Sequence, residues 1–318
     1  MLDVDTFLTT LYVLVDEIDK THAATAPAES PQRLAPGPAP ALSRSEVVTL
    51  AIFGQWAQFR SERAFYRYAQ QHLRPAFPTL PQRSQYNRLL RRSQALLVHV
   101  MQQVAHWLTP LPSAYEILDS TGVAVRNNLR RGVGWLAGQA DQGRCSRLGW
   151  YTGLHVLTVV TAEGVLTGFG VAPASVVDQR LAETLLAARQ TPQPRLPEVG
   201  QPRGGGYYLA DTGFEGRHWW PRWLHAYQAH VLIPPKRFQP FPLPWPRPAR
   251  RAFAGCRQII ETVHDRLLGC FGLAQERPHA LDGFRARLAA RAALHNICCW
   301  LNQQLGRPWL TFADLLEW

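Results

Sequence analysis

The chain contains very little lysine, and nothing in it suggests cross-linking or a membrane anchor. Its only lysines are Lys20 and Lys236, so arginine carries almost all of the positive charge. The five cysteines are odd in number and include no C-x-x-C pair, which argues against a disulfide framework or a structural zinc site. No apolar run approaches the ~20 residues of a membrane span, and the first residues lack the pattern of a secretory signal. We therefore expect a cytoplasmic protein with reduced thiols.

Basic residues clearly outnumber acidic ones in this chain. Thirty-four basic residues face 23 acidic ones, which gives a net charge of +11 and a pI near 10. Such an excess favours a polyanionic partner, above all a nucleic acid. A GC-rich genome would explain the preference for arginine over lysine, but it would not explain the net charge.

The chain divides into four segments by composition. Residues 1–22 carry apolar positions at helical spacing, and residues 23–42 form a linker rich in proline and alanine. Residues 43–111 predict an all-α DNA-binding domain that begins with a capping box at Ser43. Residues 112–318 predict a second domain, built from both strands and helices.

The second domain predicts an α/β fold. Expected strands are 115–119, 150–160, 165–171, 207–211 and 229–233, and expected helices are 176–188, 216–226, 255–269 and 281–304. The first three strands can form an antiparallel meander, and the later ones need crossover helices and so pair in parallel. The result is a mixed sheet flanked by helices.

Three acids stand out within this pattern. Asp119 and Asp211 each close a buried strand, and the topology brings the two strand ends together. Each aspartate alone could equally be a turn residue or a helix N-cap. Glu261 lies on helix 255–269, where the alternative is a surface ion pair with Arg257. Together the three carboxylates could hold two divalent metal ions of the kind that drive phosphoryl transfer.

The motifs around these acids resemble a known family. They are Ile117-Leu118-Asp119-Ser120-Thr121, Gly149-Trp150-Tyr151-Thr152-Gly153-Leu154-His155, Leu209-Ala210-Asp211-Thr212-Gly213-Phe214 and Arg257-x-x-Ile260-Glu261-Thr262-Val263. Over about 112–304 the chain resembles bacterial insertion-sequence transposases of the DDE type, which have an RNase H-like catalytic core. One branch of that family has Tyr and Lys where this chain has Ala254 and Leu268, so those contacts are not expected here.

The resemblance implies a function and a site. Asp119, Asp211 and Glu261 would bind two Mg²⁺, with Mn²⁺ as a substitute, and Arg257 would contact DNA or phosphate. The enzyme would cut double-stranded DNA at the terminal inverted repeats of its element and join the ends to target DNA, as a homo-oligomer on DNA. The alternatives are a nuclease or resolvase with the same fold, and a catalytically dead DNA-binding remnant.

Two further groups of arginines are candidate DNA contacts. Arg83, Arg88, Arg91 and Arg92 cluster on a helix for which Ser84 is the expected N-cap, and they favour either a helix-turn-helix role or a solvated basic face. Arg126, Arg130, Arg131 and Arg147 lie in a glycine-rich loop after Asp119, where phosphate contacts are expected.

Overall fold

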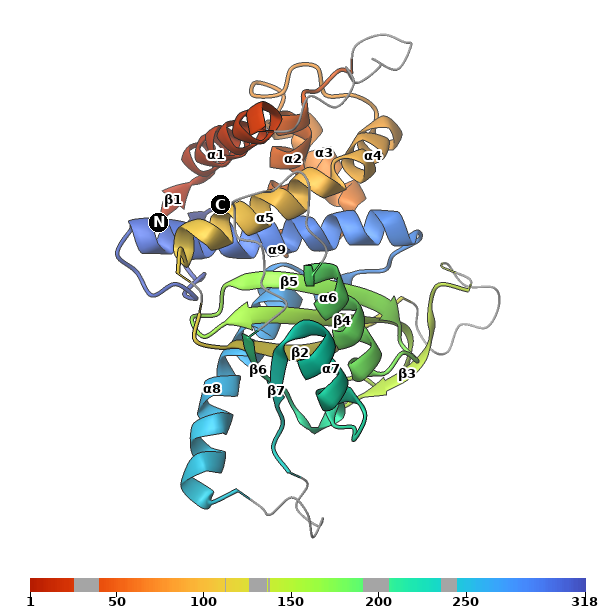
Figure 1. Ribbon diagram of the computed structural model, residues 1–318. Coiled ribbons are helices and arrows are strands. Elements are labelled where there is room, and N and C mark those ends of the chain that lie inside the picture. The colour runs from red at the N-terminus through yellow and green to blue at the C-terminus, as the bar shows by residue number, and fades with distance from the viewer. Residues whose placement is uncertain (26–39, 112, 126–135, 137, 191–205, 236–244) are drawn as a thin grey trace.

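The computed structural model describes most of the chain (Figure 1). The described residues are 1–25, 40–111, 113–125, 136, 138–190, 206–235 and 245–318. Most of the expected linker, and the candidate contacts Arg126, Arg130 and Arg131, therefore lie outside the described residues.

The N-terminal part is helical, as predicted. Its helices are α1 (Val4–Thr25), α2 (Arg44–Phe53), α3 (Glu62–His72), α4 (Arg83–Arg92) and α5 (Gln94–Leu108). The capping box is confirmed, because the Ser43 hydroxyl accepts from Glu46 N–H while the Glu46 carboxylate accepts from Ser43 N–H. The expected N-cap Ser84 is wrong: Gln82 caps α4 without its side chain, and its carbonyl accepts the N–H groups of Gln85 and Tyr86.

The second part contains the expected mixed sheet. Its strands are β2 (Glu116–Ala124), β3 (Asp141–Cys145), β4 (Gly149–Thr161), β5 (Leu166–Pro173), β6 (Gly206–Leu209) and β7 (Ala229–Leu232). β4 pairs antiparallel with β2, β3 and β5, whereas β6 runs parallel to β2 and β7 parallel to β6. The order β5-β4-β2-β6-β7 is the RNase H-like arrangement, and the fold prediction is confirmed. β3 was not expected, because its sequence Asp-Gln-Gly-Arg-Cys has no apolar run.

Helices cover both faces of this sheet. α6 (Asp178–Gln190) and α7 (Trp219–Tyr227) pack on one face around Leu118 and Leu157. α8 (Arg247–Asp265) and α9 (Leu281–Gln304) meet the opposite side chains, including Ile117 and Val156. Because side chains alternate along a strand, odd-numbered β2 residues point toward α8 and even-numbered ones toward α6. Two single-turn helices (Thr212–Phe214 and Leu273–Gln275) and a π-helical turn (Arg266–Cys270) complete this part.

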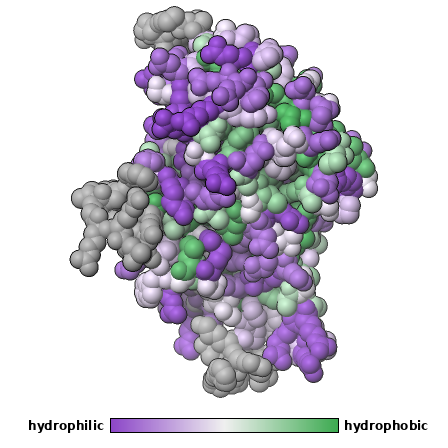
Figure 2. Space-filling model, turned by 180° about the vertical axis from the view of Figure 1, so that it is seen from behind, coloured by the Kyte–Doolittle hydropathy of each residue, from purple (hydrophilic) through white to green (hydrophobic). Residues whose placement is uncertain are grey.

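The termini meet beside the helical part. β1 (Leu2–Asp3) pairs in parallel with β8 (Leu316–Glu317), and Figure 1 shows the two chain ends close together. Seen from behind, hydrophilic residues cover much of the upper, helical end and the lower end, while hydrophobic ones gather between them (Figure 2). Within the described residues, no helix is both long and apolar enough to cross a membrane.

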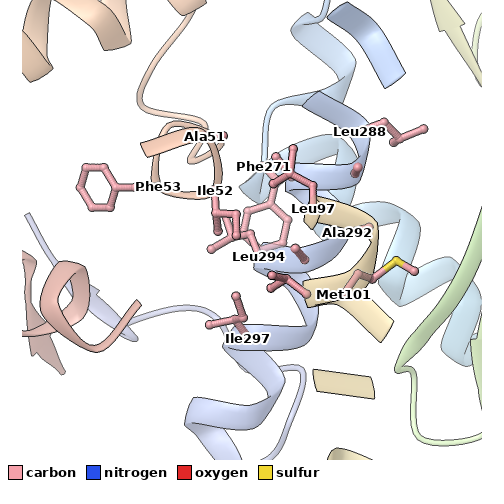
Figure 3. Packing of buried hydrophobic residues seen from close by; sticks show 14 of the residues in the cluster. Ala51, Ile52, Phe53, Leu97, Met101, Phe271, Leu288, Ala292, Leu294 and Ile297 are labelled. Carbon is pink, nitrogen blue, oxygen red and sulfur yellow. The ribbon is translucent and has the colours of Figure 1, made fainter. Parts of the chain in front are cut away.

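One continuous core joins the two parts. α9 runs between the N-terminal helices and the sheet (Figure 1), and Figure 3 shows Ile52, Leu97 and Leu294 packed together. The Asn296 amide on α9 donates to Met101 O of α5 and Leu166 O of β5. The chain therefore buries both parts against the same helix. The domain boundary at 111/112, and an independent DNA-binding role for residues 43–111, stay predictions.

Candidate active site

The strand register places the two aspartates together. Glu116 pairs with Tyr208 and Ile117 with Leu209, so two further residues along this parallel register bring Asp119 level with Asp211. Asp119 falls on the α8 face by alternation, whereas Asp211 lies two residues beyond the end of β6. The expectation that Asp119 closes its strand is wrong, because β2 continues to Ala124 through its pairing with β4. What ends near Asp119 is β6, which stops at Leu209 and leaves that edge of β2 open.

α8 brings a glutamate and a histidine to the same place. Glu261 and His264 are three residues apart on this helix, so they share a face. Asp119, Glu261 and His264 each offer a ligand atom, and all these atoms lie within 4.8 Å of one another. His264 Nε2 also lies 2.7 Å from the hydroxyl of Thr158, the residue opposite Asp119 on β4. This cluster is a possible metal site built from two carboxylates and one imidazole.

His264 was not anticipated from the sequence. The available signal was the Glu-x-x-His spacing on a predicted amphipathic helix, which places both side chains on one face. That signal is weak alone, because helix 255–269 also buries Ile260 and Val263, and a histidine among them is indistinguishable from a core residue. Burial lowers the pKa of His264 to about 4, helped by the charges of Arg147 and Arg257, so its imidazole is neutral at pH 7.

Asp119 is a buried carboxyl with too little compensating charge. Burial raises its pKa to about 7, against the lowering effects of Arg257 and of the Ser120 N–H, and the charges of Asp211 and Glu261 raise it further. Only 13% of its side chain is exposed. The Arg257 guanidinium lies 3.4 Å from the carboxylate, and no ion pair between Arg257 and Glu261 occurs among the described residues. Arg257 therefore lies within the acidic cluster.

Asp211 also has a local structural role. Its carboxylate accepts the N–H of Gly213 at 2.8 Å and caps the turn Thr212–Phe214. It is not part of the group whose ligand atoms lie within 4.8 Å, yet it is close enough to raise the pKa of Asp119. The structure thus brings Asp119 and Glu261 together directly and places Asp211 beside them.

A hydrogen-bond network supports this region from the opposite sheet face. The Ser120 hydroxyl donates to the Asp178 carboxylate at 2.6 Å and lies 2.9 Å from His155 Nε2. His155 Nδ1 in turn lies 3.0 Å from Val176 O. These contacts fix β2 against β4 and the start of α6, immediately next to Asp119.

Comparison with known proteins identifies the family. The family model described as "Transposase DDE domain" matches residues 117–297, more than half of the chain and all three acids. The chain belongs to the transposase DDE domain family. It is therefore an insertion-sequence type DNA transposase, as its motifs implied, and a DNA-cleaving enzyme by family.

Solved structures and curated proteins add little to this assignment. One similar structure is a pre-cleavage Mos1 transpososome, which is 13% identical in sequence. The match covers 87% of this chain and 82% of the Mos1 chain, with a TM-score of 0.24. A Mos1 transposase paired-end complex with the left transposon end is 12% identical and covers 84% and 86%, with a TM-score of 0.25. These scores are too low to compare residues. No curated protein matches the transposase significantly.

The candidate DNA-contacting arginines of the transposase lie on α4, near the end of β2 and at the acidic cluster. Arg83, Arg88, Arg91 and Arg92 are all exposed on α4, which is compatible with either alternative stated for them. Arg147 donates to the carbonyl of Gly122, near the end of β2. Arg257 lies at the acidic cluster, where its guanidinium is 3.4 Å from the Asp119 carboxylate.

Proposed function

We propose that this transposase cuts the ends of its element and joins them to target DNA with two divalent metal ions. The ligands would be Asp119, Asp211 and Glu261, with His264 as an additional ligand. The observation that carries the proposal is the convergence of Asp119, Glu261 and His264 within 4.8 Å, beside Asp211.

The residues present fit a divalent cation. A buried carboxyl whose pKa is raised to about 7 is a site where positive charge would be stabilising, and Arg257 supplies only part of it. Carboxylate oxygens suit Mg²⁺ and Mn²⁺, and a neutral imidazole suits a transition ion. We therefore expect Mg²⁺ as the physiological ion and Mn²⁺ as an effective substitute.

The protein groups have separate tasks. When bound, paired divalent ions activate a water or a 3′-hydroxyl and stabilise the leaving oxygen. Asp119 must first lose its proton, and Thr158 holds the His264 ring through their hydrogen bond. If a metal ion took over the compensation of the Asp119 charge, the Arg257 guanidinium could contact the scissile phosphate instead. Its Nε is buried and has no acceptor among the described residues.

The DNA partner follows from the same chemistry. Double-stranded DNA carries the phosphates to be cut, and a net charge of +11 favours its binding. We propose that the α4 arginines and Arg147 contact the backbone of the element ends, and that two or more protomers assemble on DNA.

A strand-transfer assay tests the proposal. Labelled element ends, taken from the DNA that flanks the gene, are incubated with supercoiled target plasmid and Mg²⁺ or Mn²⁺. Cleaved ends that become joined to the plasmid support transposition. Cleaved ends without joined products would indicate the nuclease alternative, and uncut ends with every divalent ion would indicate a catalytically dead remnant.

A further inference from the structure

A second polar site lies away from the acidic cluster, between the helical part and the catalytic part. It is a cavity of about 720 Å³ where the residues around α2 and α3 meet the segment before α9 and the start of α9 itself. Val125, directly after β2, lines the same cavity and links it to the strand that carries Asp119.

The cavity lining is strongly basic. Six arginines line it against two glutamates, and they are Arg60, Arg63, Arg83, Arg277, Arg287 and Arg291. The glutamates are already engaged: Glu276 accepts from Arg287 and Arg291, and Glu62 accepts from Asn87 and Arg287. Within the described part of the chain, Arg60, Arg63 and Arg83 form no ion pair and are exposed. The lining therefore keeps an excess of positive charge.

Two buried hydrogen-bond donors point to an anionic ligand. Arg291 Nη1 and Trp56 Nε1 both belong to residues that line the cavity, and neither has an acceptor among the described residues. Arg291 is 6% exposed and Trp56 is 7% exposed. Burying a donor without an acceptor is costly. An oxyanion supplies several acceptor oxygens at once, and its charge complements the surrounding guanidinium groups.

We propose that this cavity, here called the phosphate cleft, binds a backbone phosphate of the same DNA molecule that is cut at the acidic cluster. Val125 is six residues beyond Asp119, or about 20 Å along an extended strand. At a rise of ~3.4 Å per nucleotide, this separation corresponds to about six nucleotides from the scissile phosphate. The cleft would then fix the spacing between the bound backbone and the cut.

The assignment rests on the proposed function, but it is testable by binding alone. The full-length protein is titrated without divalent metal against a short labelled DNA duplex of arbitrary sequence, over a range of salt concentrations. The cleft variant is Arg60→Gln/Arg63→Gln/Arg83→Gln. The control variant Lys20→Gln/Arg180→Gln/Arg222→Gln removes the same charge from positions outside the cleft lining. Thermal melting checks that each variant is folded.

We expect the cleft variant to bind about 100-fold more weakly at low salt, and its slope of log K against log [salt] to fall by about 0.9 for each lost phosphate contact. The control should change far less. The conservative Trp56→Phe variant removes one buried donor and should weaken binding on the order of tenfold while remaining folded. Equal effects of the cleft and control variants would overturn the proposal.

Two further experiments test the position of the bound phosphate and whether that phosphate belongs to DNA. In a second duplex that carries an element end, a neutral methylphosphonate placed about six nucleotides from the cut should weaken binding of the wild type but not of the cleft variant. If inorganic phosphate stabilises the wild type against thermal unfolding while DNA binding is unaffected by the cleft variant, the cleft binds a free phosphate and the DNA assignment is wrong. A failed strand-transfer assay with the expected binding results would overturn the proposed function and leave only the binding of a DNA phosphate by the cleft.

Discussion

The pKa values of two buried carboxyl groups in this protein, Glu276 and Asp119, are shifted in opposite directions. Glu276 is 8% exposed in its side chain and accepts from Arg287 at 2.8 Å and Arg291 at 2.6 Å. Burial alone would raise its pKa, but the two guanidinium groups lower it to about 2. Asp119 is nearly as buried, has one guanidinium at 3.4 Å, and its pKa is raised to about 7.

The difference separates a carboxylate whose charge the protein compensates from one whose charge it leaves largely uncompensated. Glu276 is fully compensated by protein charges, so it holds α9 to the segment before it. Asp119 is surrounded by further acids and lacks the charge that would make its ionised form stable. Raised pKa values with nearby acids are typical of sites that bind a cation or move a proton.

The largest expected effect concerns the acids of the active site. Asp119→Asn, Asp211→Asn and Glu261→Gln should each reduce cleavage roughly a thousandfold or more, because each removes a metal-binding charge while keeping the side-chain shape. The measurement is cleavage of labelled element ends, with DNA binding recorded in parallel. Retained cleavage in any one of the three would remove that residue from the site.

Glu276→Gln should affect stability instead of chemistry. The substitution leaves the buried Arg291 without its counter-charge and the half-buried Arg287 with Glu62 alone, and breaking a buried pair costs about 3–5 kcal/mol. Chemical denaturation should show this loss, and Glu17→Gln, at an exposed position, should be nearly neutral. If Glu276→Gln is as stable as the wild type, the contrast with Asp119 is not one of structure against function.

Acid should separate the same two environments. A group whose pKa is lower in the folded protein stabilises it above the unfolded pKa, and this contribution is lost as the pH falls. Buried His99, His264 and His295, each with a pKa of about 4, should reduce stability as the pH falls from about 6.5 to 4. Asp119, whose pKa is raised to about 7, acts in the opposite direction and offsets part of this loss between about pH 7 and 4. Glu276 should then remove about 3 kcal/mol between about pH 4.5 and 2. Denaturation midpoints across pH should show both phases in the wild type and lack the second in Glu276→Gln.

The role of His264 can be tested without catalysis. His264→Ala should weaken Mn²⁺ binding on the order of 10- to 100-fold, measured by calorimetry or by the resonance signal of free Mn²⁺. His225→Ala, at an exposed position on α7, is the matched control and should bind Mn²⁺ like the wild type. Unchanged affinity in His264→Ala would limit this residue to packing against Thr158.

The smallest expected effect is at Asp265. This acid is exposed at the end of α8, four residues beyond Glu261, and it does not belong to the cluster with Asp119. Asp265→Asn should therefore retain most of the cleavage activity in the same assay. A dead Asp265→Asn together with an active Glu261→Gln would reassign the third acid.

The sequence by itself determined the elements and most of the candidate acids, because their signals are local. Apolar runs marked β2, β4 and β5, helical spacing marked α8 and α9, and the Ser43–Glu46 pair marked the start of α2. The motifs around Asp119, Asp211 and Glu261 indicated the family before any contact was known. β3 was not predicted, because this short polar strand is stabilised by its pairing with β4 and not by its own composition.

Only the tertiary structure decided which side chains share a space. It placed Asp119 within β2, paired Arg257 with Asp119, brought His264 close to Asp119 and Glu261, and placed Trp56 and Arg291 in the lining of one cavity. These pairs join residues that are far apart in the chain, and their contacts depend on how helices pack across a sheet. Local propensity carries no information on that packing, because it is decided by the burial of the shared core around α9.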